Sequence, residues 1–162
     1  MRPKKGGGFT IVELLVVMFI ISLISASILA GYWRTQDKYC AVRVGQKLAA
    51  DLRRVQNMAL SGKIQDGQVP SGYGLYTISS SRFVIFYNID SNKVFNNGSV
   101  TTEAVTLEGG VLSPVGSSIF FVPPDPTTYI DGVASGSKTF NLNLSGFNEA
   151  VTVYSSGRIE IE

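Results

Sequence analysis

The feature that most constrains this chain is an uninterrupted apolar stretch near its N-terminus. Residues 9–30 form a run of 22 residues that contains a single charged side chain, Glu13. About 20 apolar residues are enough for a helix to cross the hydrocarbon core of a bilayer, whereas the apolar part of a secretory signal peptide has about 7–15 residues. The stretch therefore predicts a transmembrane helix, and the length of the chain leaves room for one small domain after it.

Basic residues ahead of the apolar stretch predict its orientation. Arg2, Lys4 and Lys5 precede it, with no acidic residue among them. Because basic residues stay on the cytoplasmic side of a membrane helix, we expect the N-terminus in the cytoplasm and everything after residue 33 outside it. Glu13 would cost about 2.5–3.5 kcal/mol near the bilayer centre. It either reaches back toward the cytoplasmic face or meets a positively charged partner inside an assembly.

Around the start of the apolar stretch the chain reads GFTIVEL, from Gly8 to Leu14. With its basic leader and apolar run, this segment resembles the cleavage and methylation motif of type IV prepilins and pseudopilins. The resemblance implies that prepilin peptidase cuts between Gly8 and Phe9 and that Phe9 is then N-methylated. It also implies an assembly ion pair between the new amine and Glu13 of another subunit. Such a pair would neutralise two charges that are costly in an apolar helix bundle.

The same resemblance implies a fold and a location. The fold is α+β and pilin-like, with a long N-terminal helix, half transmembrane and half amphipathic, packed on an antiparallel β-sheet head. The expected parts are a leader (1–8), a transmembrane helix (9–30), an amphipathic neck helix (31–62) and a β-rich head (63–162). The chain would cross the bacterial inner membrane once, with its head outside, and then enter a cell-surface pilus or a periplasmic pseudopilus. Its implied partners are other pilin or pseudopilin subunits, prepilin peptidase/methyltransferase, an inner-membrane assembly platform, and membrane lipid before assembly.

Residues 32–61 predict the amphipathic helix independently of that resemblance. Apolar residues recur three and four positions apart, so we expect them to form one face that packs on a sheet. They are Ala41, Val44, Leu48, Leu52, Val55 and Ala59. Lys47 and Asp51 have the spacing of an ion pair along a helix, and Gly62 is placed to end the helix. Residues 52–60, LRRVQNMAL, resemble minor pseudopilins and minor pilins of the H type, which favours a minor subunit over a major one.

Charge is divided unevenly between the neck and the head. Residues 34–63 contain seven basic and two acidic side chains, whereas residues 64–162 contain four basic and nine acidic ones. The resulting net charges of +5 and −5 suit head-to-neck packing of identical subunits. A solvated basic helix face is the alternative interpretation.

The rest of the chain alternates between strand patterns and turn residues. Residues 83–88 are apolar or large at nearly every position, so we expect both faces of that strand to be covered. Strands are predicted at 73–79, 82–89, 105–112, 119–122, 138–144, 150–154 and 158–161.

Composition excludes several kinds of chemistry. The chain has no histidine and one cysteine, Cys40. It therefore has neither a Ser-His-Asp nor a Cys-His catalytic set, nor the ligands of a zinc site that needs histidine or several cysteines. We expect no enzymatic activity, no metal and no cofactor, although a carboxylate pair assembled by folding would leave a membrane-anchored hydrolase possible.

Two other functions are alternatives to a filament subunit. One is a DNA-binding minor pilin for DNA uptake, to which the Arg53-Arg54 doublet could contribute. The acidic head and a C-terminus that contains Glu160 and Glu162 repel phosphate, so we do not expect nucleic-acid binding. The other is a secreted domain released from an ordinary signal peptide cut within residues 26–30.

Overall fold

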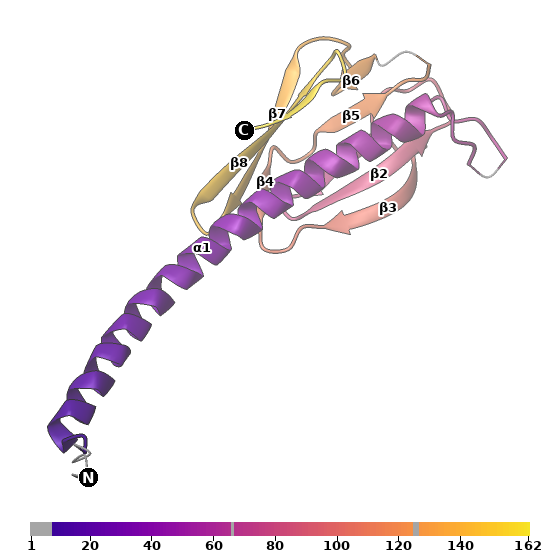
Figure 1. The fold of residues 1–162 in the computed structure, drawn as a ribbon. Helices are drawn as coiled ribbons and strands as arrows, with labels where there is room; N and C mark the ends of the chain where they lie inside the picture. The colour runs from indigo at the N-terminus through magenta and orange to yellow at the C-terminus, as the bar shows by residue number, and fades with distance from the viewer. Residues whose placement is uncertain (1–7, 66, 125–126) are drawn as a thin grey trace, which may run out of the picture. The chain divides into compact units, whose positions relative to one another are not determined.

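One long helix joins two compact parts of the molecule. The computed structural model describes residues 8–65, 67–124 and 127–162, which form a single α-helix and nine β-strands (Figure 1). The helix, α1, runs from Ile11 to Leu60. It passes from a first unit, Met1–Gln36, into a second unit, Asp37–Glu162, which contains every described strand. Apart from Gly8, the predicted leader lies outside the described residues.

A single glycine, Gly62, ends α1 at its C-terminus. Gly62 has a φ of +56°, in the left-handed region that glycine adopts without strain. Its N–H donates to the carbonyl of Ala59 (3.0 Å), and the N–H of Lys63 donates to the carbonyl of Met58 (3.3 Å). This pair of bonds satisfies two carbonyl groups that the helix leaves free. The predicted role of Gly62 is confirmed.

The strands of the second unit form two antiparallel sheets. The five-stranded sheet has the order β3 (Val100–Thr106), β2 (Arg82–Asn88), β1 (Gly72–Ser79), β5 (Ser118–Phe121) and β6 (Thr128–Ile130). The four-stranded sheet has the order β4 (Val111–Ser113), β7 (Ser137–Leu144), β8 (Phe147–Tyr154) and β9 (Ile159–Ile161). With its long helix and antiparallel sheets, the chain has the α+β, pilin-like fold that the sequence predicts.

Two details of the strand prediction are wrong. Residues 105–112 do not form one strand: β3 ends at Thr106, and β4 belongs to the other sheet. Gly109 between them has a φ of +75°, so the backbone turns out of the first sheet there. The short strand β6 was not predicted, because three residues are too few to show an alternating pattern.

A single hydrophobic core lies between α1 and both sheets. The six apolar helix residues predicted to share a face are all buried, and Leu48, Leu52 and Val55 are completely buried. They pack in one cluster with side chains of the five-stranded sheet, such as Ile85, and of the four-stranded sheet, such as Phe140. Both sheets therefore contribute side chains to the same core, and α1 packs against the side chains of each sheet.

A second layer of aromatic side chains covers the other face of the five-stranded sheet. Phe86 and Phe120 lie there with their ring centroids 5.8 Å apart. A Cβ added to Gly74 would lie 2.5 Å from the Phe86 ring, so only glycine fits beside it. The expectation that both faces of the strand at 82–89 are covered is confirmed, since residues 83–88 are buried.

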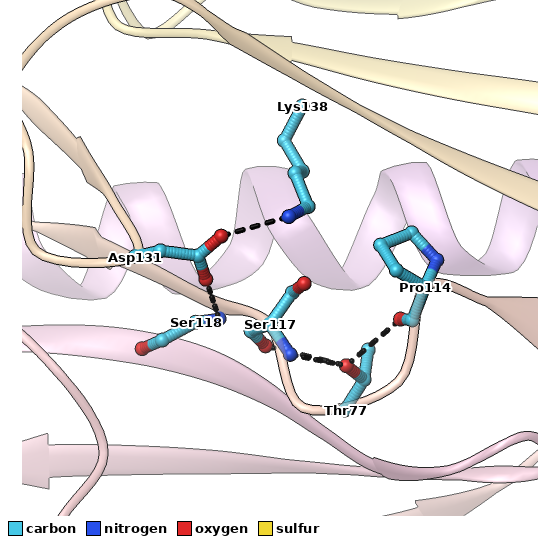
Figure 2. Close-up of polar contacts among 6 residues, drawn as sticks. All are labelled: Thr77, Pro114, Ser117, Ser118, Asp131 and Lys138. Atoms are coloured by element: carbon cyan, nitrogen blue, oxygen red, sulfur yellow. Dashed lines mark hydrogen bonds and ion pairs between the residues drawn. The ribbon is translucent and has the colours of Figure 1, made fainter.

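A buried threonine holds the connection through which the chain returns to the five-stranded sheet. The Thr77 Oγ1 on β1 donates to the carbonyl of Pro114 (3.1 Å) and accepts from the N–H of Ser117 (3.0 Å) (Figure 2). Both partners lie between β4 and β5, which belong to different sheets. One side chain therefore satisfies two backbone groups where the chain crosses between the sheets.

An aspartate holds the crossing from β6 to β7 in a similar way. One carboxylate oxygen of Asp131 accepts from the N–H of Ser118 (2.8 Å), and the other lies 2.8 Å from the Lys138 Nζ (Figure 2). Asp131 follows β6 of one sheet, and Lys138 lies on β7 of the other. The contact links the two sheets directly.

We expect Thr77→Val to destabilise the second unit by about 1–3 kcal/mol, because the buried carbonyl and N–H of the crossing would lose their partner. Chemical unfolding of the full chain in detergent, followed by near-ultraviolet circular dichroism, measures the change. Thr106→Val, at an exposed position on β3, is the matched control and should have a much smaller effect. Equal effects from the two variants would contradict the role of Thr77.

Candidate functional site

The backbone around Gly8 and Phe9 lies outside the helix. Residues 8–10 have no regular secondary structure and are exposed, and the Phe9 side chain is 81% exposed. No heavy atom beyond the chain neighbours lies within 4 Å of the position where a Cβ of Gly8 would be. A protease needs an accessible peptide bond, and the bond between Gly8 and Phe9 joins two exposed residues that precede the helix.

Thr10 determines where the helix begins. Its Oγ1 accepts a hydrogen bond from the N–H of Glu13 (3.2 Å), and its carbonyl accepts from the N–H of Leu14 (3.2 Å). Thr10 is thus the N-cap of α1, and Glu13 occupies the third helical position. This role of Thr10 was not predicted, although a threonine three residues before a glutamate is a recognisable start signal.

Glu13 projects from the first turn of an exposed apolar helix. A carboxylate is favourable there, because the N-terminal end of a helix is partially positive. Glu13 has no ion-pair partner among the residues that the structure describes. Its side chain borders a shallow apolar groove together with Phe9, Leu14, Val17, Met18 and Ile21. The first turn therefore carries one charge on an otherwise apolar surface.

The first part of α1 is long enough to cross a bilayer. Residues Ile11–Leu29 form a 19-residue apolar segment of which none is buried. At about 1.5 Å per residue this segment is about 28 Å long, close to the thickness of the hydrocarbon core of a membrane. A continuous apolar surface of this length has no partner within its own unit.

The Arg53-Arg54 doublet contacts the chain's own strands. The Arg54 Nη1 lies 2.8 Å from the Glu103 Oε2 on β3, and the Arg53 Nη2 donates to the carbonyl of Ile159 on β9 (3.4 Å). Arg54 thus connects α1 with the five-stranded sheet, and Arg53 connects it with the four-stranded sheet.

Cys40 is a free, partly exposed cysteine. Among the described residues, no three acidic or cysteine side chains are close enough together to hold a metal ion.

Asp51 does not form the predicted ion pair with Lys47. Its Oδ2 is buried and has no hydrogen-bond partner. Burial raises the pKa of the Asp51 carboxyl, while Lys47 and Arg54 act in the opposite direction and Glu103 adds to the increase. The spacing in the sequence suggested an exposed pair, but one carboxylate oxygen of Asp51 is buried, and Lys47 acts on the carboxyl without approaching to ion-pair distance.

A comparison with protein families matches the N-terminal part of the chain. The family described as the prokaryotic N-terminal methylation motif matches residues 3–29, and this motif is the signature of type IV prepilins and pseudopilins. Searches of curated proteins and of solved structures found no match. The chain therefore carries the prepilin signature, while the H-type resemblance of residues 52–60 stays a prediction.

We expect Asp51→Asn to stabilise the second unit at pH 7 and to have little effect at pH 3. The raised pKa means that the folded state binds the Asp51 proton more tightly than the unfolded chain does. Stability from this group is therefore present at low pH and is lost as the pH rises from about 4 through the folded-state pKa. Chemical unfolding of the wild-type protein and of Asp51→Asn across this pH range measures the difference in their free energies of unfolding. A difference that does not change with pH would contradict the raised pKa of Asp51.

Proposed function

We propose that this protein is a structural subunit of a type IV pilus-like filament or of a type II secretion pseudopilus. The observation that carries the proposal is the match of residues 3–29 to the methylation motif, on a chain whose bond between Gly8 and Phe9 is accessible. Proteins with this motif are structural rather than enzymatic. The exposed apolar helix is consistent with a subunit held in the inner membrane before it assembles.

The first step of the proposed maturation is cleavage between Gly8 and Phe9 by prepilin peptidase on the cytoplasmic side of the membrane. The cut removes Arg2, Lys4 and Lys5 together, so the mature chain begins with its apolar surface. Because Thr10 already caps α1, the helix can begin at Ile11 both before and after cleavage. Methylation of the new Phe9 amine keeps its positive charge.

The second step is assembly through the helix. A Glu13 carboxylate without an ion-pair partner and a charged Phe9 amine are both unfavourable in an apolar environment. Staggered helices would bring the amine of one subunit to the Glu13 of another, and each charge would then neutralise the other. The implied partners are other pilin-like subunits and the inner-membrane platform that assembles them, with the head outside the cytoplasm. The finished structure would be a surface pilus or a periplasmic pseudopilus.

The first measurement is the intact mass and N-terminal sequence of the protein from its native membranes. We expect a chain that begins at Phe9 and carries one additional methyl group. A chain that begins near residue 31 would instead identify a secreted domain, and a chain that begins at Met1 would identify a simple membrane anchor. Either of these results would contradict the proposed maturation.

We expect Glu13→Gln to be cleaved and folded normally but to enter filaments poorly. Removing one member of a buried ion pair costs about 3–5 kcal/mol, which corresponds to a loss of roughly a hundredfold or more in association. The amount of subunit in sheared or purified filaments measures the effect. Glu13→Asp retains the charge and serves as the matched control. Normal assembly of Glu13→Gln would rule out the ion pair.

A further inference from the structure

The exposed part of α1 in the second unit carries several basic side chains. Arg43, Lys47, Arg53 and Arg54 are all exposed, and we call these four residues the basic face. Arg43, Lys47 and Arg54 recur at helical spacing with Ala50 between them, so they follow one line along the helix. The buried face of α1 packs on the strands, and the helix runs along them (Figure 1).

The acidic residues of this helix segment neutralise the basic face only in part. Asp37 and Asp51 are both partly buried, and the Oδ2 of Asp51 is buried. Arg43 and Lys47 have no ion-pair partner among the described residues. The pair between Arg54 and Glu103 leaves the arginine side chain 52% exposed. The face therefore presents net positive charge outward.

The basic face is also slightly concave. A shallow depression lies beside Ala50, where a small side chain separates larger ones. Its lining residues are Ala50, Arg53, Arg54, Asn57, Met58 and Ser61. A projecting acidic side chain of a partner could enter between the two arginines, where charge-assisted hydrogen bonds are available.

The strands and loops of the same chain carry the complementary charge. Asp131 and Glu160 already pair with Lys138 and Arg158. Outside these pairs, the exposed acidic residues that the structure describes there are Asp90, Glu108 and Glu162.

The loop that carries Asp90 lies on the sheet face opposite α1. Phe95 of this loop stacks on Tyr76 with a ring-centroid distance of 4.5 Å and meets the edge of Phe86 at 5.1 Å. Phe86 belongs to the aromatic layer on the face away from the helix. The loop that carries the exposed Asp90 is thus anchored through Phe95 on the sheet face that does not pack on α1.

We propose that the basic face of one subunit binds the acidic head surface of a second copy of this chain. The inference rests on the proposed function and names a contact separate from the Glu13 ion pair. Because the two surfaces of the contact are different, each copy can bind one neighbour through its basic face and another through its acidic surface. Such a heterologous contact extends an open filament unless the rotation between copies closes a ring.

The test reverses the charges of the basic face in the full chain and measures filament assembly. We expect Arg43→Glu combined with Lys47→Glu to reduce assembly at least about tenfold, because acidic surfaces would then face each other. Lys63→Glu combined with Arg82→Glu changes the net charge equally at exposed sites outside the basic face and should assemble normally. Unchanged assembly of the first double variant would overturn the proposal.

Coexpression identifies the partner as a second copy. Three versions, with Asp90→Lys, Glu108→Lys or Glu162→Lys, are each coexpressed with the reversed basic-face variant. We expect at least one of them to restore filaments that contain both chains, because a lysine-bearing head can bind the reversed face. Failure of all three would show that the basic face binds something other than this chain, such as a different acidic subunit.

Two measurements separate this inference from the proposed function. Intact mass shows whether each variant still begins at a methylated Phe9, and thermal unfolding shows whether the second unit remains folded. A processed, folded variant that assembles normally despite the reversed face would overturn the contact alone. An unprocessed wild-type chain would instead overturn the proposed function itself.

Discussion

The burial of one face of α1 against both sheets is the interaction on which the second unit depends. The two sheets have no strand in common, and their order separates β4 from the strands that surround it in the sequence. Leu48, Leu52 and Val55 lie in the cluster that contains side chains from both sheets. Replacing one such leucine with alanine in a well-packed core typically costs about 2–5 kcal/mol. Without the helix, each sheet would expose an apolar face to water.

Polar contacts determine how the chain moves between the two sheets. Thr77 binds the backbone of the connection between β4 and β5, and Asp131 binds the N–H of Ser118 at the start of β5. Buried backbone groups that lack a partner are costly, so these contacts favour one route over others that would bury a similar apolar area. The core thus provides most of the stabilisation, and the polar contacts at the crossings favour one path of the chain between the sheets.

The helical face and the N-terminal motif could be predicted from the sequence, because both depend on local spacing. The six apolar residues from Ala41 to Ala59 recur at helical intervals, and Gly8, Phe9 and Glu13 lie within a short segment. The separation into two sheets could not be predicted in this way. Leu112 pairs with Leu142, far along the chain, and nothing in the local pattern selects that partner. The burial of the Asp51 carboxyl likewise depends on packing that spacing along one helix does not reveal.

The continuity of α1 has a mechanical consequence. One helix, Ile11–Leu60, contains both the apolar segment and the packed one. Tension applied to the N-terminal end would be carried by the helix backbone and transferred to the buried face through many side chains at once. A load shared across a packed interface is resisted by the whole core, whereas a load on a loop extends the loop first. A pull on the packed segment of α1 would therefore have to disrupt the shared core before the helix could leave the sheets.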